Sequence, residues 1–121
     1  MEIRNIKKNR YFNSVDGSEI TEVFGIPTKN LKEVSLAYAI VKPNSATLNH
    51  LHSFLEIYTI IKGNGVMHVN EEAHFVKKND SILIPAKSSH FIKNSGKKNM
   101  EFYCICVPAF TEDGTELKKE A

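Results

Sequence analysis

The chain has 121 residues and a mass of 13.7 kDa, which is the size of one domain. Hydrophobic residues make up 41% and charged residues 25% of the sequence, a composition typical of a globular protein and not of a disordered one. The net charge of +2 does not indicate nucleic-acid binding, and no apolar run approaches the ~18 residues of a membrane span.

The N-terminal residues, MEIRNIKKNR, carry charge but lack the apolar stretch of a signal peptide. Apolar residues follow between positions 11 and 33, among them Tyr11, Val15 and Phe24, ahead of the first clear strand. We expect residues 1–121 to form a single domain, with a barrel core over about 20–108. A short extra N-terminal segment and a polar C-terminal tail would flank that core.

The middle of the chain consists of short apolar runs separated by turn residues. The runs are rich in Val, Ile, Tyr and Phe, which favour strands, and they cover 34–41, 57–61, 66–69, 81–84 and 100–107. Prolines, glycines and asparagines punctuate the sequence between them. This spacing predicts an all-β sandwich or barrel.

Local signals predict two turns and one helix. The Gly-Asn-Gly sequence at 63–65, between the second and third runs, predicts a tight β-hairpin because glycine and asparagine adopt positive φ at low cost. Residues 70–73 are a second turn candidate. Thr111 can cap a helix whose first turn is acidic, so a short helix is predicted there, although Gly114 disfavours it.

The two cysteines, Cys104 and Cys106, are two residues apart in the last strand-like run. They therefore project to the same face, where strand geometry does not suit a disulfide. We interpret them as reduced thiols in a cytoplasmic protein, and the simplest role for them is as two small buried hydrophobic residues.

Three histidines and one glutamate have the spacing of a metal site. His50 and His52 point to the same side of a strand, whereas on a helix they would diverge. Glu56 follows with the same parity, and His90 comes after the run that ends at Pro85. Imidazoles and a carboxylate suit one divalent transition metal ion per chain, such as Fe, Mn, Zn, Ni or Cu.

These residues resemble the two motifs of the cupin family. Asn44 to Gly63, NSATLNHLHSFLEIYTIIKG, matches G-x5-HxH-x3,4-E-x6-G except at the first glycine. Asn79 to Asn94, NDSILIPAKSSHFIKN, keeps the proline, histidine and asparagine of G-x5-P-x-G-x2-H-x3-N. Asn79 and Lys87 replace its two glycines. Lys87 tolerates a left-handed backbone less well than asparagine does, so we expect the loop before His90 to be shaped differently.

The resemblance implies a small antiparallel jelly-roll β-barrel in which His50, His52, Glu56 and His90 bind one metal ion. Family members are often homodimers. We therefore expect residues 11–33 to lie across the sheet of a second subunit, which predicts a homodimer.

Residues with the same parity as the histidines should line the pocket. Tyr58, Ile60, Leu48 and Ile92 follow from the same runs, and the flanking runs add Tyr38, Ile40, Met67, Phe102 and Cys104, whose register the sequence leaves open. Tyr58 is also a candidate catalytic acid or hydrogen-bond donor. His68 and His74 match neither motif, and Asn94 is interpreted as a hydrogen-bonding residue of the sheet.

Arginine is scarce: Arg4 and Arg10 are the only two, and both precede the predicted barrel. A pocket for a sugar phosphate or a dicarboxylate usually uses guanidinium groups, so we expect a small ligand that is uncharged or singly charged.

The resemblance indicates dioxygenase, isomerase, lyase or decarboxylase chemistry without choosing among them. The main alternative is a non-catalytic module that binds a metal and a small molecule, and a barrel with vestigial ligands is a third possibility.

Overall fold

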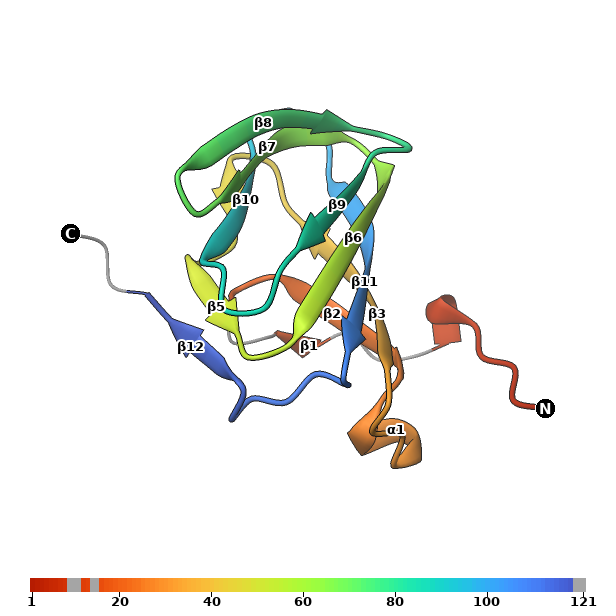
Figure 1. Ribbon diagram of the computed structural model, residues 1–121. Coiled ribbons are helices and arrows are strands. Elements are labelled where there is room, and N and C mark those ends of the chain that lie inside the picture. The colour runs from red at the N-terminus through yellow and green to blue at the C-terminus, as the bar shows by residue number, and fades with distance from the viewer. Residues whose placement is uncertain (9–11, 14–15, 119–121) are drawn as a thin grey trace.

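The computed structural model describes residues 1–8, 12–13 and 16–118, which form two antiparallel sheets around a buried core (Figure 1). The first sheet has the order β1 (Phe12–Asn13), β2 (Glu19–Phe24), β3 (Ser35–Val41), β11 (Met100–Val107), β6 (Leu55–Lys62) and β9 (Ser81–Ile84). The second has the order β12 (Thr115–Leu117), β5 (His50–His52), β10 (His90–Asn94), β7 (Asn64–Val69) and β8 (Glu72–Lys77), and β4 (Ser45–Ala46) pairs with β10.

This is the antiparallel jelly-roll barrel that the sequence predicts. Helical structure in the described residues is limited to a 3₁₀ turn, η1 (Ile6–Lys8), and one turn of α-helix, α1 (Ile26–Lys29). No helix in this part of the chain has the length and apolar character needed to cross a membrane.

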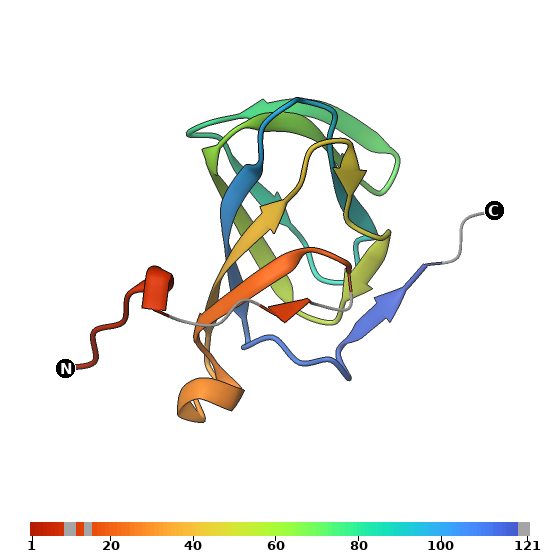
Figure 2. The same cartoon turned by 180° about the vertical axis from the view of Figure 1, so that it is seen from behind.

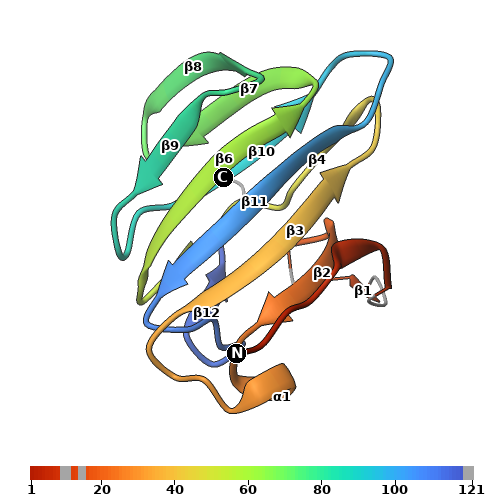
Figure 3. The same ribbon diagram turned by 90° about the vertical axis from the view of Figure 1, so that its right-hand side faces the viewer.

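The core forms because buried and partly exposed residues alternate along the central strands, which lie side by side in Figure 3. On β6 and β11 the even-numbered residues point inward, so Phe102 pairs with Ile60 and Cys104 pairs with Tyr58. Burial of each large apolar side chain stabilises the fold by about 1.5–3 kcal/mol. Cys104 and Cys106 are both free and buried, as the sequence predicts.

The predicted hairpin at 63–65 is wrong. β6 pairs with β11 and β9, whereas β7 pairs with β10 and β8, so the Gly-Asn-Gly segment carries the chain from one sheet to the other. The local sequence predicts a sharp turn of the chain at 63–65, but it does not determine which strands β6 and β7 will pair with. The turn at 70–73 does join two paired strands, since Val69 of β7 faces Glu72 of β8.

The predicted helix after Thr111 is also wrong. The hydroxyl of Thr111 accepts a hydrogen bond from the amide of Gly114 at 3.0 Å, but this bond closes a turn instead of starting a helix. The chain then forms β12, which runs along β5 with Thr115 opposite His52 (Figure 2). Pairing with the edge of β5 satisfies backbone groups that a short exposed helix would leave to water.

The motif positions that lack glycine keep a left-handed backbone. The φ angles are 58° at Asn44, 77° at Asn79 and 65° at Lys87. The amide of Lys87 donates a 2.7 Å hydrogen bond to the carbonyl oxygen of His52. Lys87 therefore adopts the left-handed backbone that lysine tolerates poorly, and this hydrogen bond helps to hold it.

The N-terminal segment differs from our expectation as well. β2 pairs with β3 of the same chain, with Ile20 opposite Ala39, and Ile20 packs against the core. Glu19–Phe24 therefore extends the chain's own sheet. Tyr11 and Val15 lie outside the described residues.

Replacement of Gly63 by alanine should destabilise the protein by about 2 kcal/mol or more. Gly63 has a φ of 81°, and a Cβ atom there would lie 2.8 Å from the carbonyl oxygen of Asn99. Alanine would thus combine backbone strain with a steric clash between the sheets. Urea unfolding measures the loss.

Gly17→Ala is the matched control. Gly17 has a φ of 87°, but its Cβ would meet only a Leu48 side-chain atom at 4.0 Å. Gly17→Ala should lower the free energy of unfolding by about 1 kcal/mol, because only backbone strain is added. Equal losses in the two variants would contradict a close approach at the corner between β6 and β7.

Candidate metal centre

The four candidate ligands come together on three strands. His50 and His52 lie on β5, His90 faces His50 from the neighbouring β10, and Glu56 reaches the same place from β6 of the other sheet (Figure 1). All four residues are buried, and one ligand atom from each lies within 4.8 Å of the others. The four side chains could therefore hold one metal ion.

Hydrogen bonds behind each ring set the orientation of the three imidazoles. The Nδ1–H of His50 donates to the carbonyl oxygen of Leu48 at 2.6 Å, and that of His90 donates to the carbonyl oxygen of Ser88 at 2.9 Å. Carbonyl oxygens only accept, so Nδ1 carries the proton in both rings. Each Nε2 is left with a lone pair that points inward.

The Nδ1 of His52 is 2.8 Å from the hydroxyl oxygen of Thr115. That hydroxyl donates its own hydrogen to the carbonyl oxygen of Thr111 at 2.9 Å, so it accepts the Nδ1–H of His52. All three histidines consequently present Nε2 lone pairs to the interior. Backing contacts of this kind orient metal-binding histidines in proteins.

A cation fits between these lone pairs and the carboxylate. Glu56 Oε1 lies 3.3 Å from Nε2 of His52 and 3.2 Å from Nε2 of His90. Both nitrogens and the oxygen are acceptors once the Nδ1 protons are assigned, so they repel one another unless a proton or a metal ion lies among them. The donor set of three imidazoles and one carboxylate suits a divalent transition metal.

The protonation states agree with metal binding. Burial lowers the pKa of His50 to about 4, with the neighbouring His90 adding to the effect, so the ring is neutral at pH 7. Burial acts to raise the pKa of Glu56, and only protonation of His52 and His90 at Nε2 would outweigh it and lower that pKa to about 2. With the Nδ1 protons assigned as above, a cation among these atoms would take the place of those Nε2 protons. The thiol of Cys106 donates to Glu56 Oε2 at 3.3 Å and helps to hold the carboxylate.

Asp16, which the sequence analysis did not single out, lies beside His50. The Nε2 of His50 is buried without a hydrogen-bond partner, and Oδ2 of Asp16 lies 3.6 Å away. The other oxygen, Oδ1, accepts from the amide of Ser18 at 3.0 Å and from its hydroxyl at 2.7 Å. The only sequence signal is the turn sequence Asp16-Gly17-Ser18, which gives no indication that this turn lies beside His50.

Six of the expected lining residues belong to the core cluster around the site. They are Tyr58, Ile60, Met67, Ile92, Phe102 and Cys104. The ring of Tyr58 is 6.1 Å from that of His90. Burial raises the pKa of Tyr58 well above its usual value, so its hydroxyl keeps the proton.

Three expected lining residues lie elsewhere. Ala37 and Ala39 of β3 pair with the inward-facing Cys104 and Phe102, so Tyr38 and Ile40 take the outer face. There Tyr38 packs edge-on against Tyr103, with ring centroids 4.9 Å apart, and donates to Glu101. Leu48 is 52% exposed and contributes its carbonyl group instead of its side chain.

The other residues singled out from the sequence have structural contacts. The amide nitrogen of Asn94 donates to the carbonyl oxygens of Val41 and Lys98, which is the sheet role we expected. His68 stacks on Phe91, and His74 is exposed. Arg4 donates to the carbonyl oxygens of Val23 and Thr28, and Arg10 lies outside the described residues.

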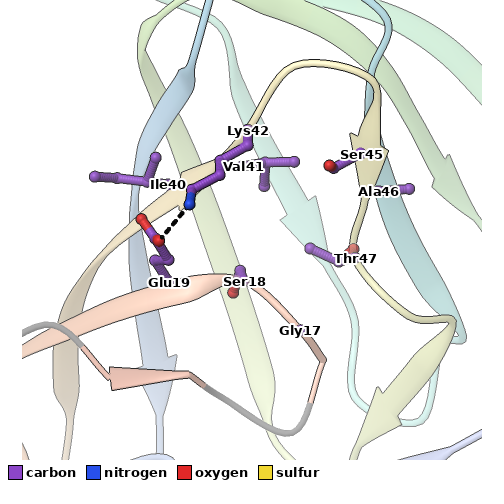
Figure 4. A pocket seen from close by; sticks show the side chains of 9 residues that line it. All are labelled: Gly17, Ser18, Glu19, Ile40, Val41, Lys42, Ser45, Ala46 and Thr47. Atoms are coloured by element: carbon purple, nitrogen blue, oxygen red, sulfur yellow. Dashed lines mark ion pairs between the residues drawn. The ribbon is translucent and has the colours of Figure 1, made fainter.

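Among the cavities of the described residues, one of about 410 Å³ lies beside β12, with Leu51, Lys87 and Thr115 in its lining, and two others flank the rest of the barrel. The larger, about 530 Å³, lies between β7–β8 of one sheet and β9 of the other, and the core residues Met67 and Val76 form part of its apolar floor. Figure 4 shows the second, about 260 Å³, where Ile40, Thr47 and the Lys42–Glu19 ion pair lie around the turn at Gly17 and Ser18. No arginine lines either cavity in the described part of the chain.

Replacement of Thr115 by valine should weaken metal binding about tenfold or more, because the Nδ1–H of His52 loses its acceptor and the ring loses its fixed orientation. Competition with a chelator measures the affinity. Thr59→Val is the matched control, since Thr59 Oγ1 bonds only with Ser81 on the outer face. An unchanged affinity in Thr115→Val would show that the ring needs no support from β12.

Comparison with known sequences finds one matching family model and several related proteins. A family model for the cupin domain matches residues 37–106. The uncharacterized protein MJ1618 of Methanocaldococcus jannaschii is 39% identical over 103 residues, which cover 84% of this chain and 82% of that protein. Auxin-binding protein 1 of Arabidopsis thaliana is 29% identical over 92 residues, 69% of this chain and only 46% of that protein, so the chain spans about half of that relative's length.

Solved structures agree on the fold. A predicted oxalate decarboxylase of Thermotoga maritima superposes with a TM-score of 0.77 at 23% identity, over 88% of this chain and 99% of that one. The motif match and the histidine–glutamate cluster on β5, β6 and β10 lie within the region that the family model covers, and that region forms the central strands of both antiparallel sheets. The chain is therefore a member of the cupin family.

Proposed function

We propose that the protein binds one divalent transition metal ion through His50, His52, Glu56 and His90, and that it acts as a metal-dependent enzyme on a small organic molecule. The observation that supports this most directly is that three Nε2 lone pairs and one carboxylate oxygen lie within 4.8 Å of one another while every Nδ1 proton has an acceptor elsewhere. Four protein ligands leave up to two positions open on a six-coordinate ion, where a bound ion can polarise a carbonyl group or activate water.

The protein side chains would orient the reacting molecule and hold protons near it. Of the two roles expected for Tyr58, acid or hydrogen-bond donor, the second fits better, because its ring lies near that of His90 and its raised pKa keeps the hydroxyl protonated. Ile60, Ile92 and Phe102 would exclude water and provide apolar contact. Dioxygenase, isomerase, lyase and decarboxylase reactions all fit this arrangement.

The ligand we infer is small and either uncharged or singly charged. The core around the site is apolar, and the larger cavity offers an apolar floor of Met67, Val76 and Ile82. No guanidinium group of the described residues faces either cavity. A relative that is named for binding auxin supports a small organic ligand.

A non-catalytic binding module is the second candidate. That relative is named a binding protein and not an enzyme, and the same four side chains would hold the metal in either case. The two candidates differ only in turnover, so a binding module would bind small molecules without converting them.

Metal analysis of the untagged protein tests both candidates. We expect about one transition metal ion per chain in the wild type and a large loss in Glu56→Gln, because the amide removes the anionic ligand. Glu101→Gln is the matched control, since Glu101 is paired with Tyr38 on the outer face.

Turnover of enolisable or aromatic substrates by the loaded protein would identify an enzyme. Metal binding and a ligand-induced rise in melting temperature without turnover would identify a binding module. A stoichiometry far below one after remetallation would contradict both candidates.

We also propose a homodimer through the outer face of the first sheet. A row of apolar residues crosses four of its strands at facing positions, in the order Leu36, Ile105, Ile57 and Leu83. Leu83 is 60% exposed, and the other three are only partly buried. A second copy of this face would cover the row.

Light scattering coupled to size exclusion should give about twice the 13.7 kDa of one chain. Leu83→Glu should weaken the dimer at least tenfold because the charge would enter an apolar interface. Phe75→Glu is the matched control, since Phe75 is 64% exposed on β8 of the other sheet. A wild-type mass of one chain would contradict the dimer.

A further inference from the structure

We propose that Asp16 borders the open coordination position of the metal and selects neutral, hydrogen-donating ligands over carboxylates. This inference rests on the metal site proposed above and adds the class of ligand that the site accepts. The ligand we envisage binds the metal through an oxygen atom and presents an N–H or O–H group beside it.

The side chain of Asp16 lies inside the barrel beside His50. The turn between β1 and β2 brings this carboxylate into the barrel, where the residue is 9% exposed. Ser18 holds Oδ1 with two hydrogen bonds, at 3.0 Å and 2.7 Å. The other oxygen lies 3.6 Å from Nε2 of His50, which has no hydrogen-bond partner of its own.

The contacts of Asp16 differ from those of the four clustered ligands. Glu56 lies against the Nε2 atoms of His52 and His90, whereas Asp16 lies against that of His50. Two ligands of one metal ion with bonds of about 2.1 Å are about 3 Å apart when adjacent, so 3.6 Å places Asp16 next to the coordination sphere. Asp16 is not among the four residues whose ligand atoms all converge.

The charge of Asp16 changes the net charge of the proposed site. Three neutral imidazoles and the carboxylate of Glu56 leave a residual +1 on a divalent ion, which favours an anionic ligand at an open position. The carboxylate of Asp16 brings the formal sum to zero. In a buried site of low dielectric, it would repel a second carboxylate and accept a hydrogen bond from a neutral donor.

The surroundings of Asp16 offer little compensation for a bound anion. The neighbouring cavity includes one cationic group, Lys42, which is already paired with Glu19 at 3.2 Å (Figure 4). An anion bound beside His50 would therefore meet Asp16 without a free positive charge from the described lining residues.

A matched pair of ligands tests the proposal. Glycolate and glycolamide have the same shape and bind a metal through the same two oxygen positions, but only glycolate is an anion. Their dissociation constants are measured from the visible spectrum of the Co(II)-loaded protein, in the wild type and in Asp16→Asn. We expect the dissociation constant for glycolate divided by that for glycolamide to be at least tenfold larger in the wild type than in Asp16→Asn.

Two further variants control for structure. Glu101→Gln removes the charge of a carboxylate that accepts a hydrogen bond from Tyr38 on the outer face, and it should leave the ratio unchanged. Asp16→Ser keeps a side-chain acceptor for the turn and replaces Asp16→Asn if that variant does not fold.

The outcomes separate this inference from the proposed function. Metal binding in the wild type with the same ligand ratio in Asp16→Asn would overturn the role of Asp16 and leave the metal site intact. Loss of the metal in Asp16→Asn and Asp16→Ser would also overturn it, because Asp16 would then be a direct ligand. Failure of the wild type to bind any metal would instead overturn the metal site itself.

Discussion

The candidate metal centre depends on the hydrogen bonds that hold the Nδ1 protons of three histidines. Leu48 and Ser88 accept through backbone carbonyls, and Thr115 accepts through a hydroxyl whose own hydrogen is used elsewhere. With these protons committed, each ring can only offer a lone pair to the interior. The four side chains could therefore hold a cation.

This constraint explains why charged and polar groups are tolerated in the interior. A buried carboxylate such as Glu56 is costly unless it is paired; here the thiol of Cys106 donates to one oxygen, and a cation among the two neighbouring imidazoles would compensate the other. Asp16 is compensated in a similar way by Ser18. The apolar residues of β6, β10 and β11 surround this polar centre and provide the stability that it does not.

Several features of the site follow from the residues alone. The spacing of His50, His52 and Glu56 needs only the two-residue repeat of a strand, so the shared face can be predicted without knowledge of any partner strand. The two motifs add His90 and the barrel fold. The shared parity with His50, His52 and Glu56 also predicts the inward direction of Tyr58 and Ile60, whereas the sequence leaves the register of Phe102 open.

The tertiary structure alone decided how distant segments meet. β3 carries apolar residues on both faces, so its own pattern does not reveal that Ala37 and Ala39 face the core and Tyr38 faces outward; pairing with β11 decides this. Pairing likewise turned the Gly-Asn-Gly segment into a corner between sheets and placed β12 against β5. Asp16 reaches His50 only because the chain folds back across 34 positions. The residue types of the sequence determine which side chains can bind a metal. Strand register determines which of these side chains meet, and it arises from contacts between residues far apart in the sequence.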